Sequence, residues 1–175
     1  MIKPAKSKAI FLDRDGVLNV ERGEYTWQPA DFEVCPGVPD ALALLKQAGY
    51  LLIVVTNQAG IARGLYTKAH VLACHQKLQE ACGHLLDALY MAPGHPQYAQ
   101  TLSRKPDSLM LEKAMARFDL DPAQCWLVGD KMRDVEAASK VEVRAVLVGE
   151  QPAQPHPWQA PDLLAAAYLI LGQSA

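Results

Sequence analysis

Short apolar runs alternate with segments of helical periodicity along most of this 175-residue chain. The apolar runs predict five buried strands, at 9–12, 50–55, 88–91, 125–128 and 143–148. Apolar residues at helical spacing predict helices at 38–47, 67–86, 106–118, 131–139 and 162–171. Because strands and helices alternate, the sequence predicts an α/β fold with a doubly wound, Rossmann-like parallel sheet.

Glycine and proline residues mark several boundaries. Gly49 is expected to end the first helix, and Pro106 to occupy the first turn of the third. Residues 151–161 contain four prolines and predict an extended surface segment, followed by a final helix that docks on the body. We therefore expect a single domain over 1–175, in which a core at about 8–149 precedes the proline-rich segment and C-terminal helix.

Composition and charge narrow the class of protein. Hydrophobic residues make up 50% of the chain, the net charge is −2 and the pI is about 6.2. Without a basic run, a nucleic-acid partner is not favoured. No stretch has the length of a membrane-spanning helix, and the apolar run at 9–12 is too short for a signal peptide, so we expect a cytoplasmic protein without a membrane partner. No long exposed apolar helix calls for a partner, which predicts a monomer, and the four scattered cysteines are expected to be reduced.

The decapeptide at 10–19 places two carboxylates at the end of the first predicted strand. Apolar residues run into Asp13, Asp15 follows two positions later, and Gly16 lets the chain turn. Open α/β sheets bind their ligands at the carboxyl ends of strands. Two carboxylates there suit Mg²⁺, and they also suit a nucleophile beside a proton donor. An ordinary Asp-Gly turn explains the same pattern, so the decapeptide alone leaves both interpretations open.

A threonine follows the second predicted strand. Thr56 offers a hydroxyl, and Asn57 and Gln58 add backbone amides, in a position suited to a phosphate oxygen. In the glycine-bearing segment 59–64, Arg63 either meets an anion or anchors the loop. Asn and Gly are also ordinary turn residues, so this motif alone has two explanations.

A lysine and a third aspartate complete the set. Lys105 precedes the third predicted helix, where it adds positive charge to an anion site, although a solvated basic pair with Arg104 is the usual alternative. Asp130 ends the fourth strand and is expected to join Asp13 in a carboxylate cluster. Asp134 either braces the loop or serves as the second choice of metal ligand. Agreement among four strand ends in order favours a site over four unrelated turns.

These residues match, in order, the four motifs of the haloacid dehalogenase superfamily of phosphatases: Asp13-Arg14-Asp15-Gly16, Thr56, Lys105, and Gly129-Asp130 with Asp134. The match spans about 8–149. Longer strings resemble the D-glycero-D-manno-heptose 1,7-bisphosphate 7-phosphatases, at 13–19, 56–64, 104–106 and 129–131. The resemblance implies a haloacid dehalogenase-like fold without a large cap domain, and a phosphatase in the synthesis of ADP-heptose or GDP-heptose, precursors of lipopolysaccharide and related glycans.

The resemblance also implies a role for each motif residue. Asp13 is expected to attack phosphorus and form an aspartyl-phosphate, while Asp15 acts as general acid and then as general base. Mg²⁺ is expected to bind Asp13, the backbone carbonyl of Asp15, and Asp130. Thr56 and Lys105 are expected to hold the phosphoryl oxygens.

Substrate-binding residues are expected beside these motifs. Arg104 and Asn57 are the leading candidates for the rest of the substrate, because a bisphosphate needs a second anion site and Arg makes bidentate phosphate contacts. Glu21, Arg22 and Tyr25 lie in the segment after the first motif, which forms a small flap over the site in this superfamily.

One departure from the family concerns zinc. The resembling enzymes usually carry a structural zinc loop, with a Cys-Pro-His start and a Cys-x-Cys pair before Arg-Lys-Pro. Here residues 92–96 read Ala-Pro-Gly-His-Pro and residues 101–103 read Thr-Leu-Ser. His95 alone cannot form a four-coordinate site, so we expect no zinc and a loop held by its prolines and its packing.

Three other functions remain open from the sequence. Histidinol-phosphate phosphatases share much of the pattern, and polynucleotide 3′-phosphatases carry similar Thr-Asn-Gln and Arg-Lys-Pro strings. The absence of a basic stripe counts against the polynucleotide substrate. A non-catalytic phosphosugar-binding module is also compatible with the fold. The sequence decides neither the heptose anomer nor whether the substrate is a heptose.

Overall fold

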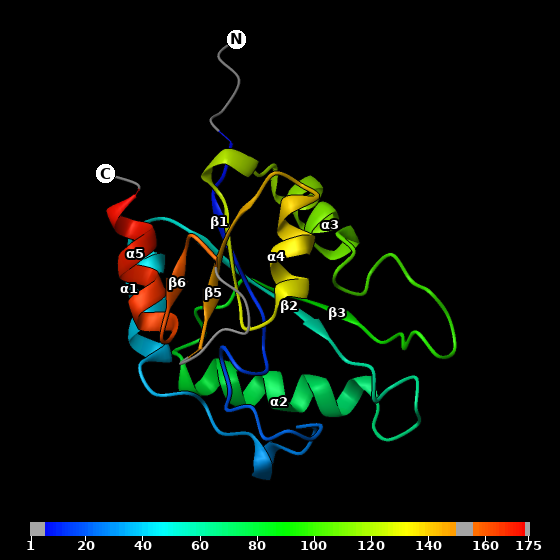
Figure 1. Ribbon diagram of the computed structural model, residues 1–175. Helices are drawn as coiled ribbons and strands as arrows, with labels where there is room; N and C mark the ends of the chain where they lie inside the picture. The colour runs from blue at the N-terminus through cyan, green and yellow to red at the C-terminus, as the bar shows by residue number, and fades with distance from the viewer. Residues whose placement is uncertain (1–5, 150–155, 174–175) are drawn as a thin grey trace.

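The computed structural model describes residues 6–149 and 156–173 (Figure 1). Its centre is a six-stranded sheet with the order β3-β2-β1-β4-β5-β6, in which every pair of neighbours is parallel. The strands are β1 (Ala9–Leu12), β2 (Leu51–Asn57), β3 (Ala88–Ala92), β4 (Trp126–Gly129), β5 (Arg144–Val148) and β6 (Gln159–Ala160). The doubly wound parallel sheet predicted from the sequence is confirmed.

The strand order reverses direction at β1. The chain adds β2 and β3 on one side of β1 and then returns to add β4 and β5 on the other. In β1, Ile10 pairs with Leu52 on one side and with Trp126 on the other. A crevice forms where the order reverses, outside the carboxyl ends of the strands, and this is where such sheets bind ligands.

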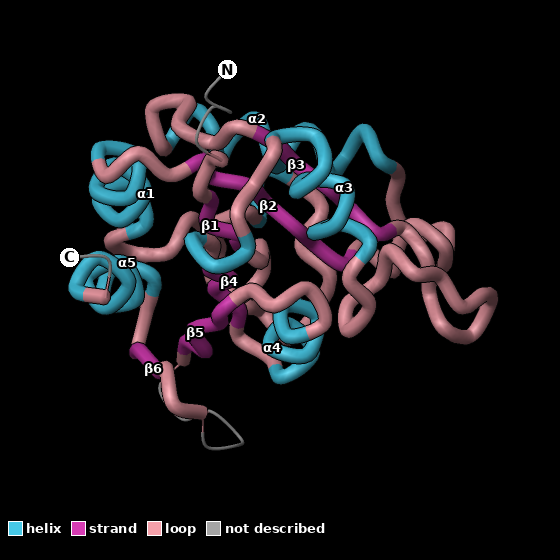
Figure 2. Tube along the Cα trace, turned by 90° about the horizontal axis from the view of Figure 1, so that it is seen from above, coloured by secondary structure: helices cyan, strands magenta, loops and turns pink. Residues whose placement is uncertain are grey.

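Five α-helices cover the two faces of the sheet: α1 (Val38–Gln47), α2 (Lys68–Ala81), α3 (Leu109–Phe118), α4 (Met132–Ser139) and α5 (Leu163–Gly172). Seen from above, α1 and α5 lie on one side of the sheet and α3 and α4 on the other (Figure 2). The side chains of β1 alternate accordingly: Ile10 and Leu12 join the core under α1, α2 and α5, while Ala9 and Phe11 join the core under α3 and α4. Among the described residues, no helix is long and apolar enough to span a membrane.

The second helix is shorter than predicted. It ends at Ala81 rather than near Leu86, because Gly83 and His84 both adopt left-handed backbone angles, with φ of 63° and 58°. Gln79 Nε2 then donates a hydrogen bond to the Leu86 carbonyl, and Gln79 Oε1 accepts one from the Leu86 amide. The residues after the helix are therefore held by a side chain instead of by the helical ladder.

The third helix begins later than predicted. It starts at Leu109, and Pro106 lies in a preceding turn in which the Asp107 amide donates to the Arg104 carbonyl at 2.8 Å. The prediction that Pro106 opens the helix is wrong, because this turn directs Lys105 into the interior, where it is 1% exposed.

The chain after β5 adds a strand that sequence patterns did not indicate. Residues 151–155 of the proline-rich segment lie outside the described residues, but β6 pairs with β5 through Leu147–Gln159 and Val148–Ala160. Asp162 then caps α5, accepting a hydrogen bond from the Ala165 amide at 2.8 Å. The last helix docks on the body, as predicted, and it does so by packing against α1.

Candidate active site

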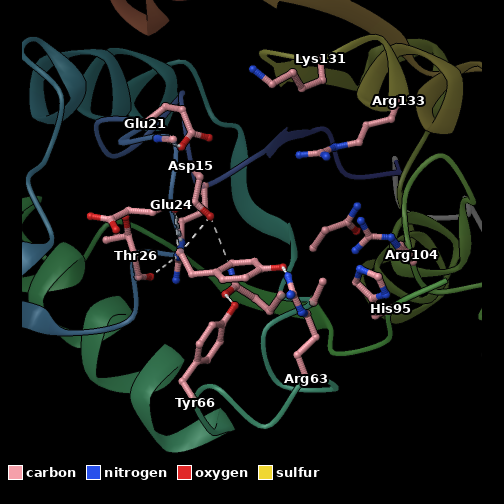
Figure 3. Close-up of a pocket in the computed structure, with 16 residues that line it drawn as sticks. Asp15, Glu21, Glu24, Thr26, Arg63, Tyr66, His95, Arg104, Lys131 and Arg133 are labelled. Atoms are coloured by element: carbon pink, nitrogen blue, oxygen red, sulfur yellow. Dashed lines mark hydrogen bonds and ion pairs between the residues drawn. The ribbon is translucent and has the colours of Figure 1, made fainter. Parts of the chain in front are cut away.

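A cleft of about 740 Å³ opens above the carboxyl ends of the central strands (Figure 3). Asp13 follows β1, Thr56 lies in β2 and Asp130 follows β4, so the sheet itself brings the predicted residues together. Asp13 and Thr56 are buried and do not line the cleft, but their immediate neighbours do, among them Arg14, Asp15 and residues 57–59.

Lys105 is the centre of a buried charge cluster. Its Nζ lies 2.9 Å from Asp13 Oδ1 and 2.6 Å from Asp134 Oδ1, and it donates to the Val55 carbonyl at 2.8 Å. Burial alone would lower the pKa of Lys105, but the two carboxylates raise it overall, so the ammonium keeps its charge. The lysine therefore fixes Asp13 and Asp134 in one orientation.

The cluster contains more negative than positive charge. Carboxylate oxygens of Asp13, Asp130 and Asp134 all lie within 4.8 Å of one another. Burial raises the pKa of Asp130, and the negative charge of Asp13 adds to that effect. Burial likewise raises the pKa of Asp134, against the attraction of Lys105. Removing these carboxylates from water is therefore unfavourable without a further positive charge.

One oxygen of this cluster has no partner among the described residues. Asp130 Oδ1 is buried without a hydrogen bond, while Asp130 Oδ2 lies 2.7 Å from Lys131 Nζ. Three convergent carboxylates with one unsatisfied oxygen match the ligands that a hard divalent cation prefers. Asp134, the second choice in the sequence analysis, lies in this cluster, and it also braces the loop by accepting the Lys131 amide at 3.1 Å.

Two glycines allow the loops of the cluster to touch. A Cβ at Gly16 would stand 2.5 Å from Asp130 Oδ2, and one at Gly129 would stand 2.3 Å from Asp134 Cβ. Gly16 also has a φ of 84°, in the region that other residues rarely adopt. The glycine of the first motif is therefore needed for contact with the fourth motif as well as for the turn.

The side chain of Asp15 is not part of the cluster formed by the Asp13, Asp130 and Asp134 carboxylates. It accepts hydrogen bonds from Arg14 Nη2 at 2.8 and 3.0 Å and from Asn19 Nδ2 at 3.0 Å. Arg14 is 1% exposed and also donates to the Thr26 carbonyl at 2.7 Å. This arrangement leaves only the backbone of Asp15 for the predicted metal contact and holds its carboxylate at the edge of the cleft.

Asn57 ties the loop that carries Lys105 to the sheet. Its Nδ2 donates to the Lys105 carbonyl and its Oδ1 accepts the Lys105 amide, both at 3.0 Å. Asn57 lines the cleft as predicted, but both polar ends of its side chain are used in this pair. A substrate contact for Asn57 stays a prediction.

Basic side chains form one wall of the cleft, which we call the basic wall: Arg63, His95, Arg104 and Arg133. Figure 3 shows His95, Arg104 and Arg133 on one side, with Glu21 and Glu24 on the other. Burial lowers the pKa of Arg104, and the nearby charge of Arg133 lowers it further. In the described part of the chain, none of the three arginines pairs with a carboxylate, and Arg133 Nε is buried without a partner. This wall suits an anion.

The flap, residues 20–28, lies across the cleft from His95, Arg104 and Arg133, while Arg63 reaches it and donates to the Tyr25 hydroxyl at 3.2 Å (Figure 3). Glu21 lines the cleft, although its Oε1 also accepts the Gly23 amide at 2.9 Å. Arg22 does not line the cleft, because its guanidinium pairs with Glu24 at 2.8 Å and with Asp31 at 3.4 Å. Of the flap residues predicted to meet substrate, the structure therefore brings Glu21 and Tyr25 to the cleft.

The loop at 93–104 is closed by short-range contacts. The Thr101 side chain packs so closely on Gly94 that a Cβ there would lie 2.9 Å from it. Ser103 Oγ donates to Thr101 Oγ1 at 3.3 Å, and Arg104 Nη1 to the Gly94 carbonyl at 3.4 Å. The His95 and Tyr98 rings are 5.8 Å apart. These contacts involve the stretches where the resembling enzymes carry zinc ligands, and the absence of zinc stays a prediction.

Four side chains at the site were missed as functional candidates: Arg14, Gln58, Tyr66 and Arg133. Arg14 and Gln58 stand inside the motifs, yet nothing in their spacing shows that their side chains turn inward. Tyr66 and Arg133 lie outside the motif strings. The one available signal was charge, since Arg133 follows Asp130 by three positions at the start of a helix.

Comparison with known proteins agrees with this geometry. Residues 102–168 match the family model of HAD-like hydrolases. A D-glycero-beta-D-manno-heptose-1,7-bisphosphate 7-phosphatase of Haemophilus ducreyi is 41% identical over 146 residues, 78% of this chain and 80% of that protein. The enzyme of the same name from Escherichia coli is 40% identical, over 77% of this chain and 75% of that protein.

Solved structures give the same result. The D,D-heptose 1,7-bisphosphate phosphatase of B. bronchiseptica, complexed with magnesium and phosphate, has a TM-score of 0.84 and 33% identity and covers 97% of this chain and 99% of its own. The corresponding enzyme of Burkholderia thailandensis has a TM-score of 0.68 and 31% identity, with 95% and 99% covered. The chain therefore belongs to the HAD-like hydrolases and, within them, to the family of the heptose 1,7-bisphosphate 7-phosphatases.

Proposed function

We propose that this protein is a Mg²⁺-dependent phosphatase that removes the 7-phosphate of D-glycero-β-D-manno-heptose 1,7-bisphosphate, a step toward ADP-heptose. The observation that carries the proposal is the buried set of Asp13, Lys105 and Asp134 beside Asp130, in a chain that is 41% identical to a phosphatase of that name. The β anomer is taken from the names of the relatives.

Asp13 is the nucleophile in this proposal. Its Oδ1 accepts the Arg14 amide at 2.8 Å and pairs with Lys105 at 2.9 Å, which leaves Oδ2 to attack phosphorus in line. A bond forms between Oδ2 and phosphorus while the bond from phosphorus to the oxygen on C7 breaks. Asp15 gives a proton to that departing oxygen. It then takes a proton from the water that attacks the aspartyl-phosphate and releases inorganic phosphate.

Three carboxylates would hold the metal: Asp13, Asp130 and Asp134, with the backbone carbonyl of Asp15 as a further ligand. The unsatisfied Oδ1 of Asp130 supports this assignment, because a buried carboxylate oxygen without a partner is unfavourable. When bound, Mg²⁺ neutralises the repulsion between an anionic substrate and Asp13. Thr56 and Lys105 would contact the phosphoryl oxygens.

The basic wall would bind the phosphate that is not transferred. Arg104 and Arg133 approach each other without a carboxylate between them, and a second anionic group would neutralise both. Arginine suits this role because its guanidinium makes bidentate contacts to phosphate oxygens. We further propose that the enzyme acts as a cytoplasmic monomer without bound zinc.

The test is phosphate release with Mg²⁺ from a panel of substrates: both anomers of the heptose bisphosphate, heptose 7-phosphate, histidinol phosphate and a 3′-phosphorylated oligonucleotide. We expect the β bisphosphate to have the highest kcat/KM. A preference for histidinol phosphate or the oligonucleotide would replace the proposed substrate and keep the chemistry. Phosphate release from none of them, with Mg²⁺ still bound, would point to a non-catalytic phosphosugar-binding module.

A further inference from the structure

Tyr66 is a buried aromatic residue that the chemistry above does not use. It is 4% exposed, and its hydroxyl donates to Gln58 Oε1 at 2.8 Å. The ring lies directly on Gly60, where a Cβ would stand 2.1 Å from Tyr66 Cε1. Glycine at position 60 is therefore what allows the ring to reach Gln58.

Gln58 connects Tyr66 to two residues of the proposed reaction, Thr56 and Asp15. It is 1% exposed, and its Nε2 donates to Thr56 Oγ1 at 2.8 Å and, more weakly, to Asp15 Oδ2 at 3.4 Å. Tyr66, Gln58 and their two acceptors thus form one hydrogen-bond chain, drawn in part in Figure 3. It joins a residue beyond the second motif to the proposed acid and to the threonine.

The direction of each hydrogen bond in the chain follows from the groups involved. The Tyr66 hydroxyl donates to the Gln58 oxygen, and burial raises the pKa of Tyr66 to about 12, so the hydroxyl keeps its proton. The Gln58 amide oxygen is taken by this hydroxyl, so its amide nitrogen faces Thr56 and Asp15. Thr56 Oγ1 accepts from the same nitrogen, which leaves its own hydrogen for another acceptor. In the proposed reaction that acceptor is a phosphoryl oxygen.

The flap packs on the same tyrosine. The Trp27 ring stacks on Tyr66 with centroids 6.3 Å apart, and the Tyr25 ring meets it edge-on at 5.8 Å. Trp27 also contacts His70 of α2 at 4.9 Å. The position of Tyr66, and with it the hydroxyl that orients Gln58, therefore depends on how the flap is seated.

We propose that Tyr66 is a positioning residue of the phosphatase reaction, which acts through Gln58 to align the Thr56 hydroxyl and the Asp15 carboxylate for transfer. This inference rests on the proposed function. Loss of the Tyr66 hydroxyl leaves the Gln58 amide free to rotate. In the rotated amide the oxygen faces Thr56, so Thr56 donates to Gln58 instead of to the phosphoryl group. The predicted loss is therefore in kcat rather than in substrate binding.

A double-mutant cycle on the full chain tests the inference. Tyr66→Phe keeps the ring packing and is expected to lower kcat about five- to tenfold, with KM within about twofold. Gln58→Met keeps the volume, removes the amide and is expected to lower kcat at least as far. In the Gln58→Met background, adding Tyr66→Phe is expected to change kcat by less than about twofold, because the hydrogen-bond chain is already interrupted at position 58.

Tyr50→Phe is the matched control. Tyr50 is 3% exposed and directly precedes β2, at the end of that strand opposite to Thr56. Tyr50→Phe removes a buried phenol hydroxyl that is not part of the hydrogen-bond chain from Tyr66, so we expect wild-type kcat. Urea unfolding of each variant shows that it is folded in the assay.

The outcomes separate the two proposals. Equal losses from Tyr66→Phe in both backgrounds, a change in KM alone, or an unchanged kcat would overturn the positioning role. A wild-type chain that is inactive on the heptose bisphosphate rejects the proposed substrate only. The same cycle is then measured with p-nitrophenyl phosphate. Its leaving group departs without a proton from Asp15, so this substrate tests the alignment of Thr56 at the phosphoryl group and of Asp15 as the base in the second step.

Discussion

The floor and the rim of the cleft are built in different ways. The floor is the buried cluster at the strand ends, where the side chains of Asp13, Lys105 and Asp134 are at most 3% exposed and their ion pairs measure 2.6 to 2.9 Å. The rim consists of the flap and the loop at 93–104. In that loop Tyr98 and Leu102 are 61% and 69% exposed.

This contrast separates chemistry from recognition. Residues on a rigid sheet edge keep their geometry, because each depends on strands that are buried on both faces. Residues on exposed loops change with little effect on the core. The chain can therefore keep the four motifs while its loop at 93–104 departs from the zinc-loop pattern that the resemblance led us to expect.

Asp13→Asn should have the largest effect on activity. Loss of the nucleophilic carboxylate is expected to lower kcat at least about 10³-fold, measured as phosphate release with Mg²⁺. Asp40→Asn, in the exposed first turn of α1, is the control and should retain wild-type activity. Substantial turnover by Asp13→Asn would contradict the assignment of the nucleophile.

Lys105→Met should have the largest effect on stability. It leaves Asp13 and Asp134 facing each other in the interior, which is expected to cost about 3–5 kcal/mol in the free energy of unfolding. Urea unfolding in EDTA measures it, because a bound cation would mask the loss. Adding Asp134→Asn removes one of the two facing charges and should restore part of the stability.

Lys140→Met is the matched change on the surface. Lys140 pairs with Asp107 at 2.7 Å, but both side chains are more than two-fifths exposed. Its loss is expected to cost at most about 1 kcal/mol. Similar losses for Lys105→Met and Lys140→Met would show that the floor is not the rigid unit described above.

Arg104→Ala tests the rim through substrate selectivity. Loss of a charged hydrogen bond to the second phosphate is expected to lower kcat/KM for the bisphosphate about 10- to 100-fold, with less than about threefold change for heptose 7-phosphate. Arg133→Ala should act in the same direction. Arg117→Ala, on the exposed face of α3, is the control. Equal losses on both substrates would reject the second-phosphate role.

The contrast between the floor and the rim also explains which residues of the site could be predicted from the sequence. Asp13, Thr56 and Asp130 were predictable because parallel strands bring their carboxyl ends to one edge of the sheet. The burial of Lys105 was not, since it depends on the turn before α3 and on Asp134. The fold shows the same limit, because β6 has two residues and is too short to carry a pattern.

Side-chain contacts between distant segments were harder still. Arg104 and Arg133 are 29 positions apart and lie on the same wall of the cleft (Figure 3) only because α4 follows the strand next to β1. The chain from Tyr66 to Asp15 spans 51 positions and depends on a glycine that has no side chain to mark it. Contacts of this kind have no periodicity, so they appear only with the coordinates.

Zinc chelation should have the smallest effect of all. The loop at 93–104 is closed by the Thr101 side chain on Gly94 and by the Arg104 bond to the Gly94 carbonyl, neither of which needs a metal. A zinc-selective chelator is therefore expected to shift Tm by less than about 1 °C, whereas loss of a structural zinc removes folding free energy directly. Elemental analysis of the untreated protein is the control, and we expect less than a tenth of an equivalent of zinc, roughly the background of an unoccupied site. Bound zinc together with a clear fall in Tm would contradict a loop closed by side chains, and would mean that His95 binds zinc with ligands outside the family's pattern.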